Sequence, residues 1–435
     1  MKMIRRVAKV NTTNKMTIAF DVSKDKLNYY SEVEGKIAGN NYRDQFAIED
    51  EIKNTPLGII TCLEELLGFA KSHGFDGIHI VCEPTGSYSN LLLNTSHRKG
   101  HTTAYVNGES VYKAKVIENN DNGKDDIKDP RVIFMLSKMG KEQTYRILPP
   151  EYKALRDLNR LYDVANKFRI ETKTRIHHLL IRLFSEFPMG KDFIYHHSGH
   201  MLFEEYGFSP WKIVEDSFEI FSVKMKKRCK GIFGSSLTKI YSAAQQSVLH
   251  AVSELELEIL EQHYKYLYED YLRADLRRTT IRTQIEEMYH SLTKTELKIP
   301  ISDEKVMQPF YLGRILGETG PLSDFSSIYE LQKYSGLNLR KRESGYYKGK
   351  LRMSKKGRAP LRGILGGMAF KLVKKSEIFG EYYHRRKNEE GLSGTKLLAI
   401  VERKLLKIIF GMAKNNESYN QNKFMTCESQ YQLVA

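Results

Sequence analysis

Two acidic residues stand where a metal-dependent nuclease would need ligands. Asp21 ends an apolar run that begins at Met16, and Glu83 directly follows a second apolar run, residues 77–82. Both runs are typical of buried strands, and carboxylates at the ends of adjacent strands converge in space. Taken singly, each acid would also fit an ordinary turn or loop position. Together they predict a site for Mg²⁺, which prefers carboxylate oxygens and can organise phosphodiester chemistry.

A pair of aspartates adds two further candidate ligands. Asp126 and Asp129 are three residues apart, so a helix would present them on one face. Two alternatives stay open at this point. Asp125 could take the place of Asp126, and Asp129 could be the N-cap of a helix that begins at Pro130.

A strongly cationic segment lies far from these acids in the sequence. Between Arg340 and Arg362 there are ten basic residues and a single acid, Glu343, a density that suits contact with phosphates. Ser344 precedes a glycine in this segment and could attack phosphorus, although its composition does not distinguish it from neighbouring serines. The predicted nucleic-acid-binding residues are Arg340, Lys341, Arg342, Tyr346, Lys348, Lys350, Arg352, Lys355, Lys356, Arg358 and Arg362.

Overall composition also favours a polyanionic partner. The chain has 435 residues and a formal net charge of +16, so several packed domains and binding to nucleic acid are both expected. It contains no apolar run long enough to span a membrane and no secretory signal pattern. The four cysteines are widely spaced and form no zinc or disulfide pattern, which favours a reducing cytoplasm.

The elements that must position the acids are predicted within residues 1–145. Strand patterns cover residues 17–22, 26–33 and about 36–42, followed by a helix, a strand, a helix and a strand. The later elements are predicted at residues 56–73, 78–82, 88–98 and 102–106, with a further helix from about Pro130. This order is that of the ribonuclease H-like fold, an α/β fold with a mixed sheet.

The remainder of the chain is predicted to be mostly helical. Residues 146–295 contain two long amphipathic segments, 151–187 and 237–292, that could pair as an antiparallel coiled-coil arm or pair between subunits. In the first, the predicted seam consists of Leu158, Leu161, Ala165, Phe168, Thr172, Ile176, Leu179 and Leu183. Residues 296–414 form a third unit of helices, and residues 415–435 form a polar tail expected to be loose.

These residues resemble a known family. The chain is similar to the DEDD transposases of bacterial insertion sequences, the Piv/MooV type of insertion-sequence family 110. The first part resembles the family's RuvC-like domain through Ile-Ala-Phe-Asp-Val-Ser-Lys, Cys-Glu-Pro-Thr-Gly-Ser-Tyr and a Lys-x-Asp-x-x-Asp element. The last part resembles its transposase domain through Tyr-Ser-Gly-Leu at 334–337, Glu-Ser-Gly at 343–345 and Gly-Arg at 357–358.

The resemblance implies roles for particular residues. Asp21, Glu83, Asp126 and Asp129 would be the acidic residues that hold Mg²⁺, and Ser344 would be the nucleophile that forms a transient covalent link to DNA. Members of this family excise and insert an element with the help of a structured non-coding guide RNA, the bridge RNA. The acidic centre of one protomer is expected to act with the serine of another, so a dimer, and a tetramer on donor and target DNA, would follow. The resemblance also implies a bacterial cytoplasmic protein that is associated with the nucleoid when active.

Two other functions are compatible with the same residues. A Holliday-junction-type nuclease would use the acidic centre with water as the nucleophile, and it would leave the Ser344 segment as a binding surface. A nucleic-acid-binding protein without catalysis would bind independently of Mg²⁺ and with a steep dependence on salt. The first predicts hydrolytic cuts without a covalent adduct, and the second predicts no strand cleavage.

Overall fold

The chain folds into two compact units, residues 1–147 and residues 148–435, as seen in a computed structural model. The structure describes residues 14–36, 43–119, 128–190, 192–249, 253–295, 298–303, 305–340, 343–344, 347–348 and 352–421. For residues 34–36, 43–46, 116–119, 128, 343–344 and 347–348 it describes the backbone alone.

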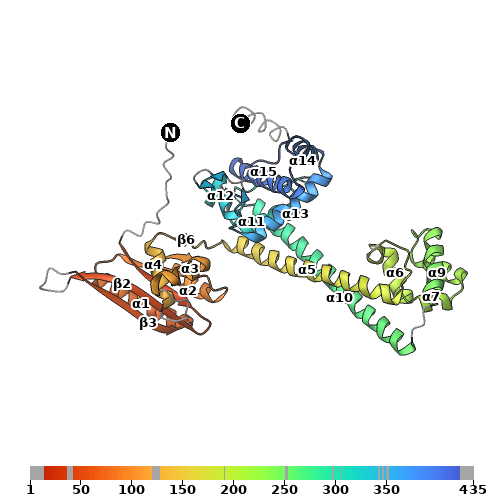
Figure 1. Ribbon diagram of the computed structural model, residues 1–435, viewed down its shortest axis with the longest axis horizontal. Helices are drawn as coiled ribbons and strands as arrows, with labels where there is room; N and C mark the ends of the chain where they lie inside the picture. Colours follow the sequence, from red (N-terminus) through yellow and green to blue (C-terminus); the bar gives the residue numbers. More distant parts are fainter. Residues whose placement is uncertain are drawn as a thin grey trace. The chain divides into compact units, whose positions relative to one another are not determined.

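The first unit is built on a six-stranded mixed sheet (Figure 1). Its strands lie in the order β3-β2-β1-β4-β5-β6. β1 pairs in parallel with β4, and β4 with β5, whereas the β1–β2, β2–β3 and β5–β6 pairs are antiparallel. The strands span Lys15–Val22, Lys26–Lys36, Arg43–Lys53, Gly77–Cys82, Thr102–Val106 and Glu142–Thr144.

Helices cover both faces of this sheet. α1 (Pro56–Ser72) and α2 (Tyr88–Arg98) pack on the face that carries Ile18, Phe20 and Ile80. α3 (Gly108–Asn119) and α4 (Lys128–Lys138) pack on the opposite face, where Ala19 and Val81 meet buried residues of both helices. Because side chains alternate between the faces of a strand, the odd-numbered residues of β1 and β4 point toward α3 and α4.

This topology confirms the predicted mixed α/β sheet, whose strand order is that of the ribonuclease H-like fold. Three elements differ from the prediction. The third strand is β3, residues 43–53, and not the segment around residues 36–42; of that segment, residues 37–42 lie outside the described residues. β3 is an edge strand rich in charged residues, so its sequence lacks the apolar run of a buried strand. α3 and β6 were not expected.

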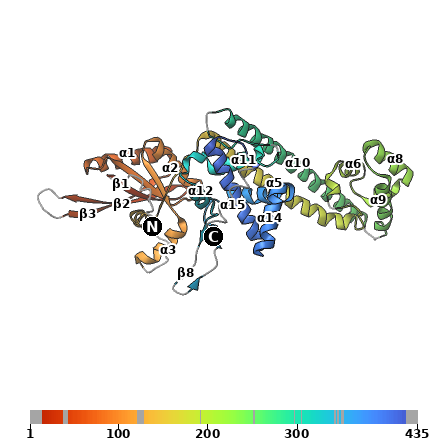
Figure 2. The ribbon, with the colours of Figure 1, turned by 90° about the horizontal axis from the view of Figure 1, so that it is seen from above.

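Two long helices extend through the second unit, and this helix pair is called the arm below. α5 (Pro150–Leu183) and α10 (Glu254–Thr293) run antiparallel, as both views show (Figures 1 and 2). Arg182, at the end of α5, lies 3.3 Å from the Glu256 carboxylate at the start of α10. Leu155 and Tyr289, near the opposite ends of the pair, share one hydrophobic core.

The buried face of α5 includes five residues of the predicted seam, namely Ala165, Thr172, Ile176, Leu179 and Leu183. It differs from the seam at three positions. Leu161 and Phe168 are 56% and 42% exposed, whereas the polar Asn159 is only 1% exposed. The Asn159 side-chain amide donates to the Arg314 carbonyl oxygen at 2.8 Å. A satisfied amide can be buried at little cost, so the core-facing side of the helix includes a polar residue that hydrophobic periodicity excludes.

A small helical lobe closes the far end of the arm. It contains a short 3₁₀ turn, Phe193–Tyr195, and four helices. The helices are α6 (His197–Tyr206), α7 (Pro210–Glu215), α8 (Phe218–Arg228) and α9 (Gly234–Ser247). The predicted helix over residues 237–292 is therefore two helices, because α9 ends at Ser247 and the Ser253 hydroxyl caps α10 by accepting from the Glu256 amide.

The remaining helices pack around the near end of the arm. α11 (Pro309–Thr319), α12 (Ile328–Ser335), α13 (Ala359–Lys375), α14 (Glu377–Glu390) and α15 (Gly394–Asn415) share a core with the start of α5 and the end of α10. Ser327 caps α12, and Gly336 ends it in a left-handed conformation. None of the described helices is long and apolar enough to cross a membrane.

Candidate functional site

Asp21 and Glu83 lie next to each other at the carboxyl ends of two parallel strands. In the β1–β4 pair Phe20 is opposite Cys82, so the two acids that follow occupy equivalent positions on adjacent strands. Both are odd-numbered and belong to the face covered by α3 and α4. The strands thus bring together two carboxylates that are 62 positions apart in the sequence.

Asp129 joins them from the first turn of α4. The helix begins at Lys128, so Asp129 lies within the first turn and not in front of it. Its carboxylate contacts Lys115 of α3, with the ammonium nitrogen 2.5 Å from Oδ1 and 2.7 Å from Oδ2. The contact to Oδ1 is an ion pair without an aligned hydrogen bond, which leaves this buried oxygen short of a donor.

The electrostatics of Glu83 show that the three carboxylates share one local field. Partial burial raises the pKa of Glu83, and the negative charges of Asp21 and Asp129 raise it further, while Lys115 lowers it. The backbone of α3 comes close as well, because a Cβ placed at Gly108 would collide with Glu83 Oε1. A cation among these oxygens would relieve their repulsion.

The donor set suits a hard divalent cation such as Mg²⁺. Asp21, Glu83 and Asp129 offer carboxylate oxygens alone, and Oδ1 of Asp129 is buried without an aligned donor. Among the described residues, however, no three acidic, histidine or cysteine side chains are arranged closely enough to hold an ion. Asp126, the fourth predicted ligand, and its alternative Asp125 lie outside the described residues.

Lys115 is a residue of this cluster that sequence reasoning missed. Its side chain is 13% exposed and belongs to α3, a helix that was not predicted. The surrounding sequence mixes charged, small and apolar residues without clear helical periodicity, so no local signal marks this lysine. Its proximity to Asp129 depends on the packing of α3 against α4.

The cationic segment of the second unit is a strand-rich loop between α12 and α13. β7 (Leu339–Arg340) pairs antiparallel with β10 (Arg352–Met353), and β8 (Glu343–Ser344) pairs with β9 (Tyr347–Lys348). β8 is labelled in Figure 2. Ser344 is opposite Tyr347 in the inner pair, and Arg340 is opposite Arg352 in the outer one.

The predicted nucleic-acid-binding residues of this loop differ in their surroundings. Arg340, Arg352 and Lys355 are exposed. Arg358 and Arg362 contact protein groups: Arg358 Nε donates to Glu318 at 2.7 Å, and Arg362 donates to the Ser335 carbonyl at 2.8 Å. For Ser344 and Lys348 the backbone alone is described, and Lys341, Arg342, Tyr346 and Lys350 lie outside the described residues.

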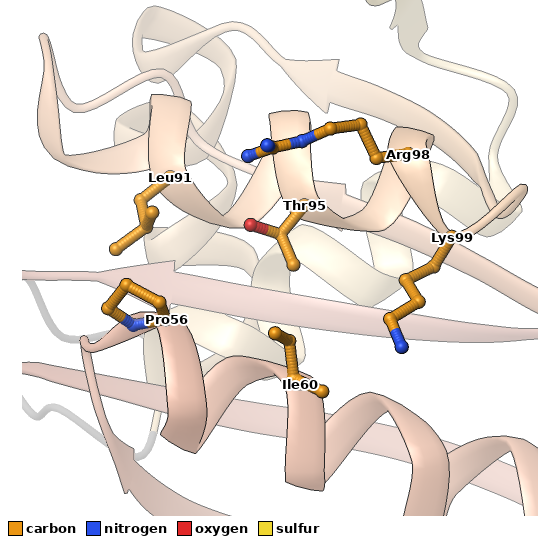
Figure 3. Close-up of a pocket in the computed structure, with 6 residues that line it drawn as sticks. All are labelled: Pro56, Ile60, Leu91, Thr95, Arg98 and Lys99. Atoms are coloured by element: carbon orange, nitrogen blue, oxygen red, sulfur yellow. The ribbon is translucent and has the colours of Figure 1, made fainter.

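A separate cavity of about 440 Å³ lies between α1 and α2. Figure 3 shows its lining from the two helices, with Pro56 and Ile60 on α1 facing Leu91 and Thr95 on α2. The cavity is on the sheet face opposite to α3 and α4. It contains none of the predicted acids, so it does not belong to the acidic cluster.

Two parts of the chain match models of protein families. Residues 43–185 match a family model described as a transposase, and residues 305–384 match one described as the transposase IS116/IS110/IS902 family. The first match contains Glu83, Asp126 and Asp129, and the second contains Ser344. Together the two matches span about half of the chain.

Part of the chain is also similar to a solved structure. The RuvC structure from Thermus thermophilus matches 30% of this chain and 99% of its own, at 9% sequence identity and a TM-score of 0.22. The ribonuclease H-like strand order is a property of the sheet itself, through the order and pairing of its strands. No curated protein matches the chain.

Proposed function

The chain belongs to the insertion-sequence 110 family of transposases, and from this premise we propose that it cuts and rejoins DNA through a covalent link at Ser344. The observation that carries the proposal is the convergence of Asp21, Glu83 and Asp129 on one face of the sheet. Such a cluster serves phosphate chemistry when a cation neutralises it. The transposase match over residues 305–384, which include Ser344, supports a role for the second unit in the same reaction.

The acidic residues would hold Mg²⁺ and so align the scissile phosphate. Asp21, Glu83 and Asp129 would supply oxygen ligands, with Asp126 as the fourth. The ion, when bound, would withdraw charge from the phosphate and favour nucleophilic attack. Lys115 would balance the negative charge around Asp129, as it does in the structure.

Ser344 would perform the covalent step. Its hydroxyl oxygen would attack phosphorus and form an O–P bond, while the bond from phosphorus to the leaving DNA oxygen breaks and that oxygen takes up a proton. A strand hydroxyl would then attack the phosphoserine, reseal the DNA and return the proton to Ser344. The exposed Arg340, Arg352 and Lys355 would bind the phosphate backbone of DNA or RNA.

The other features assigned by resemblance belong to the same proposal. A structured guide RNA would select the DNA, and protomers would assemble as dimers and then tetramers, so that the acidic centre of one acts with Ser344 of another. α5 and α10 would serve as a coiled-coil arm for this assembly. The functional division would be a RuvC-like domain at 1–145, an arm at 146–295, a transposase domain at 296–414 and a tail at 415–435.

Covalent trapping tests the proposal directly. A labelled duplex that carries the junction of the element and its flank is incubated with the protein, Mg²⁺ and RNA transcribed from that flank. Wild-type protein should yield a DNA adduct that survives denaturation. Ser344→Ala should abolish the adduct, whereas Ser354→Ala, in the same cationic segment, should leave it in place. Asp21→Asn should reduce it strongly.

The outcomes separate this reaction from the alternatives. An adduct that persists at normal yield in Ser344→Ala would contradict the nucleophile assignment. Hydrolytic cuts without an adduct would indicate a Holliday-junction-type nuclease that uses water. Binding that is independent of Mg²⁺, with no cleavage at all, would indicate a protein that only binds nucleic acid.

A further inference from the structure

Glu318 is a buried carboxylate that joins three segments of the second unit. It lies near the end of α11 and is 1% exposed. Its Oε2 accepts from Arg358 Nε at 2.7 Å, and its Oε1 accepts from the Asn159 side-chain amide at 3.2 Å. Arg358 directly precedes α13, and Asn159 belongs to α5. The acid thus bridges the arm and the point where the cationic loop ends.

Backbone hydrogen bonds join the two ends of the loop between α12 and α13. The Arg358 amide donates to the Tyr334 carbonyl at 2.7 Å, and the Lys355 amide donates to the Gly336 carbonyl at 2.9 Å. Gly357 has a φ of +156°, and a Cβ there would lie 2.5 Å from both the Tyr334 oxygen and the Gly336 nitrogen. The two ends of the loop therefore touch with no space for a side chain at Gly357.

A second set of hydrogen bonds fixes the backbone that carries Glu318. Arg156 of α5 donates from Nε to the Gly317 carbonyl at 2.9 Å and from an NH2 group to the Glu318 carbonyl at 2.7 Å. The Tyr334 hydroxyl donates to the same Glu318 carbonyl at 2.9 Å. The ends of α11 and α12 are thus tied to each other and to the arm.

This arrangement differs from an ordinary surface ion pair. The Glu318 side chain is almost fully buried, so its charge is tolerated only because Arg358 and Asn159 satisfy its oxygens. Removal of its charge would leave the Arg358 guanidinium without its carboxylate partner. The segment just before α13 would be affected first. β10 lies in that segment and pairs with β7, so both strands would lose their anchor to the helical core.

We propose that Glu318 is a positioning residue for the strand-transfer reaction. By holding Arg358 it fixes both ends of the loop that carries Ser344, and through Asn159 it ties that loop to α5. The inference rests on the proposed role of Ser344 and extends it, because the family matches assign no function to Glu318. Its substitution should slow the covalent step and leave DNA binding intact.

Adduct formation provides the first test. With saturating labelled duplex, Mg²⁺ and flank-derived RNA, Glu318→Gln should slow adduct formation about 10- to 100-fold, as expected when a reacting group is displaced slightly. The dissociation constant for the same DNA should change less than about twofold, since the exposed basic residues remain. Glu318→Asp retains the charge and should recover part of the rate.

Asp163→Asn is the matched control. Asp163 is on α5 and accepts from Arg314 of α11 at 2.5 Å, so the pair joins the same two helices without reaching Arg358. The control should lower thermal stability less than Glu318→Gln, because the Asp163 side chain is 53% exposed, and it should leave the adduct rate near that of the wild type. Equal loss of rate in both variants would overturn the proposal, because general loosening of the α5–α11 contact would then explain it.

Limited trypsin digestion tests the position of the loop without reference to Ser344. The loop contains many lysines and arginines between 340 and 352. Cleavage there should be at least about tenfold faster in Glu318→Gln than in the wild type or in Asp163→Asn, at temperatures well below unfolding. Unchanged cleavage together with an unchanged adduct rate would overturn the proposal.

The two assays distinguish a failure of the proposed function from a failure of the positioning role of Glu318. If wild-type protein forms no serine-linked adduct, the proposed function is wrong, and digestion still shows whether Glu318 holds the loop. If wild type forms the adduct and Glu318→Gln forms it equally fast, the positioning role is wrong and the function stands. If Glu318→Gln does not fold, Glu318→Asp carries both measurements, with the same expected order of rates.

Discussion

The ammonium nitrogen of Lys115 lies 2.5 Å from Oδ1 of Asp129, inside the cluster that also contains Glu83. Both side chains are largely shielded, at 13% and 20% exposure, so the pair is screened less than a surface pair. Lys115 also lowers the pKa of Glu83, which means that its charge acts on more than one carboxylate. The lysine therefore offsets part of the electrostatic repulsion among these acids.

Substitution of Lys115 by methionine should destabilise the first unit when no divalent cation is present. The expected loss is about 1–2 kcal/mol of unfolding free energy, between the values typical of exposed and of fully buried pairs. Saturating Mg²⁺ should raise the unfolding free energy of Lys115→Met by more than it raises that of the wild type. Thermal unfolding with EDTA and with Mg²⁺ measures both quantities.

Lys113→Met is the control for this variant. Lys113 is on the same helix and pairs with Glu109 at 2.5 Å, but its side chain is 68% exposed. It should change the unfolding free energy by less than about 0.5 kcal/mol. A Lys115→Met protein as stable as this control, with and without Mg²⁺, would show that Lys115 does not balance the acids.

Mg²⁺ should stabilise the wild-type protein through the acidic cluster itself. Ligands that bind the folded state alone raise the melting temperature. Glu83→Gln and Asp21→Asn should each remove most of this Mg²⁺-dependent rise, and adduct formation should fall by about 100-fold or more, since even the loss of an outer-sphere partner commonly costs 10–100-fold. Differential scanning fluorimetry across a Mg²⁺ titration reports the first effect.

Asp25→Asn gives the comparison for this titration. Asp25 is an exposed turn acid close to Asp21 in the sequence, on the short connection between β1 and β2. Its substitution should leave the Mg²⁺-dependent rise unchanged. A full rise in Glu83→Gln and Asp21→Asn would mean that the cation binds elsewhere in the protein.

The positions of Asp21 and Glu83 at adjacent strand ends could be predicted from sequence, for a physical reason. Asp21 and Glu83 follow apolar strands whose parallel pairing places them in equivalent positions, so the local pattern and the fold carry the same information. Lys115 was missed because it reaches Asp129 only when α3 packs on α4, a long-range event without a local signature. Asp129 was predicted as a candidate, but its partner was not.

Hydrophobic periodicity found much of the buried face of α5 and was wrong at three positions for a related reason. It selected Leu161 and Phe168, which are exposed, and passed over Asn159, which is buried. The amide of Asn159 is satisfied by the Arg314 carbonyl and by Glu318, both more than 150 positions away in the sequence. Apolar periodicity cannot reveal a buried polar residue whose partners lie on another helix.

The close approach of the two ends of the cationic loop at Gly357 predicts that a larger residue there lowers stability. Gly357→Ala would place a Cβ against the backbone of Tyr334 and Gly336, so the loop must shift. We expect a loss of about 2–3 kcal/mol in the stability of the second unit, from strain and broken backbone hydrogen bonds. Chemical denaturation followed by circular dichroism provides the measurement.

A glycine within α13 serves as the control for this substitution. Gly363 is helical and a Cβ there would meet nothing within 4 Å. Gly363→Ala should stabilise the protein by about 0.5–1 kcal/mol, since alanine favours the helix. If the two variants shift stability in the same direction, the close approach at Gly357 does not constrain the loop.

Glu402 gives the second unit a predictable response to pH. It lies on α15 against Gly366 of α13, where a Cβ would be 3.2 Å from Glu402 Oε1. Burial raises the pKa of Glu402 to about 7 from an ordinary value of 4.5, although the positive charge of Arg362 opposes the rise. Between these two values the folded protein keeps a proton that the unfolded chain releases, so the contribution of Glu402 to stability falls as pH rises.

Glu402→Gln should therefore be more stable than the wild type above pH 7 and close to it below pH 4.5. Because Glu402 is only partly buried, solvent screening reduces the expected gain to about 1 kcal/mol, or about 2–4 °C in the melting temperature at pH 8. Thermal unfolding at half-unit steps from pH 4.5 to 8 measures the difference between the two proteins. A difference that stays constant over this range, or that shrinks toward pH 8, would contradict the assignment of a raised pKa to Glu402.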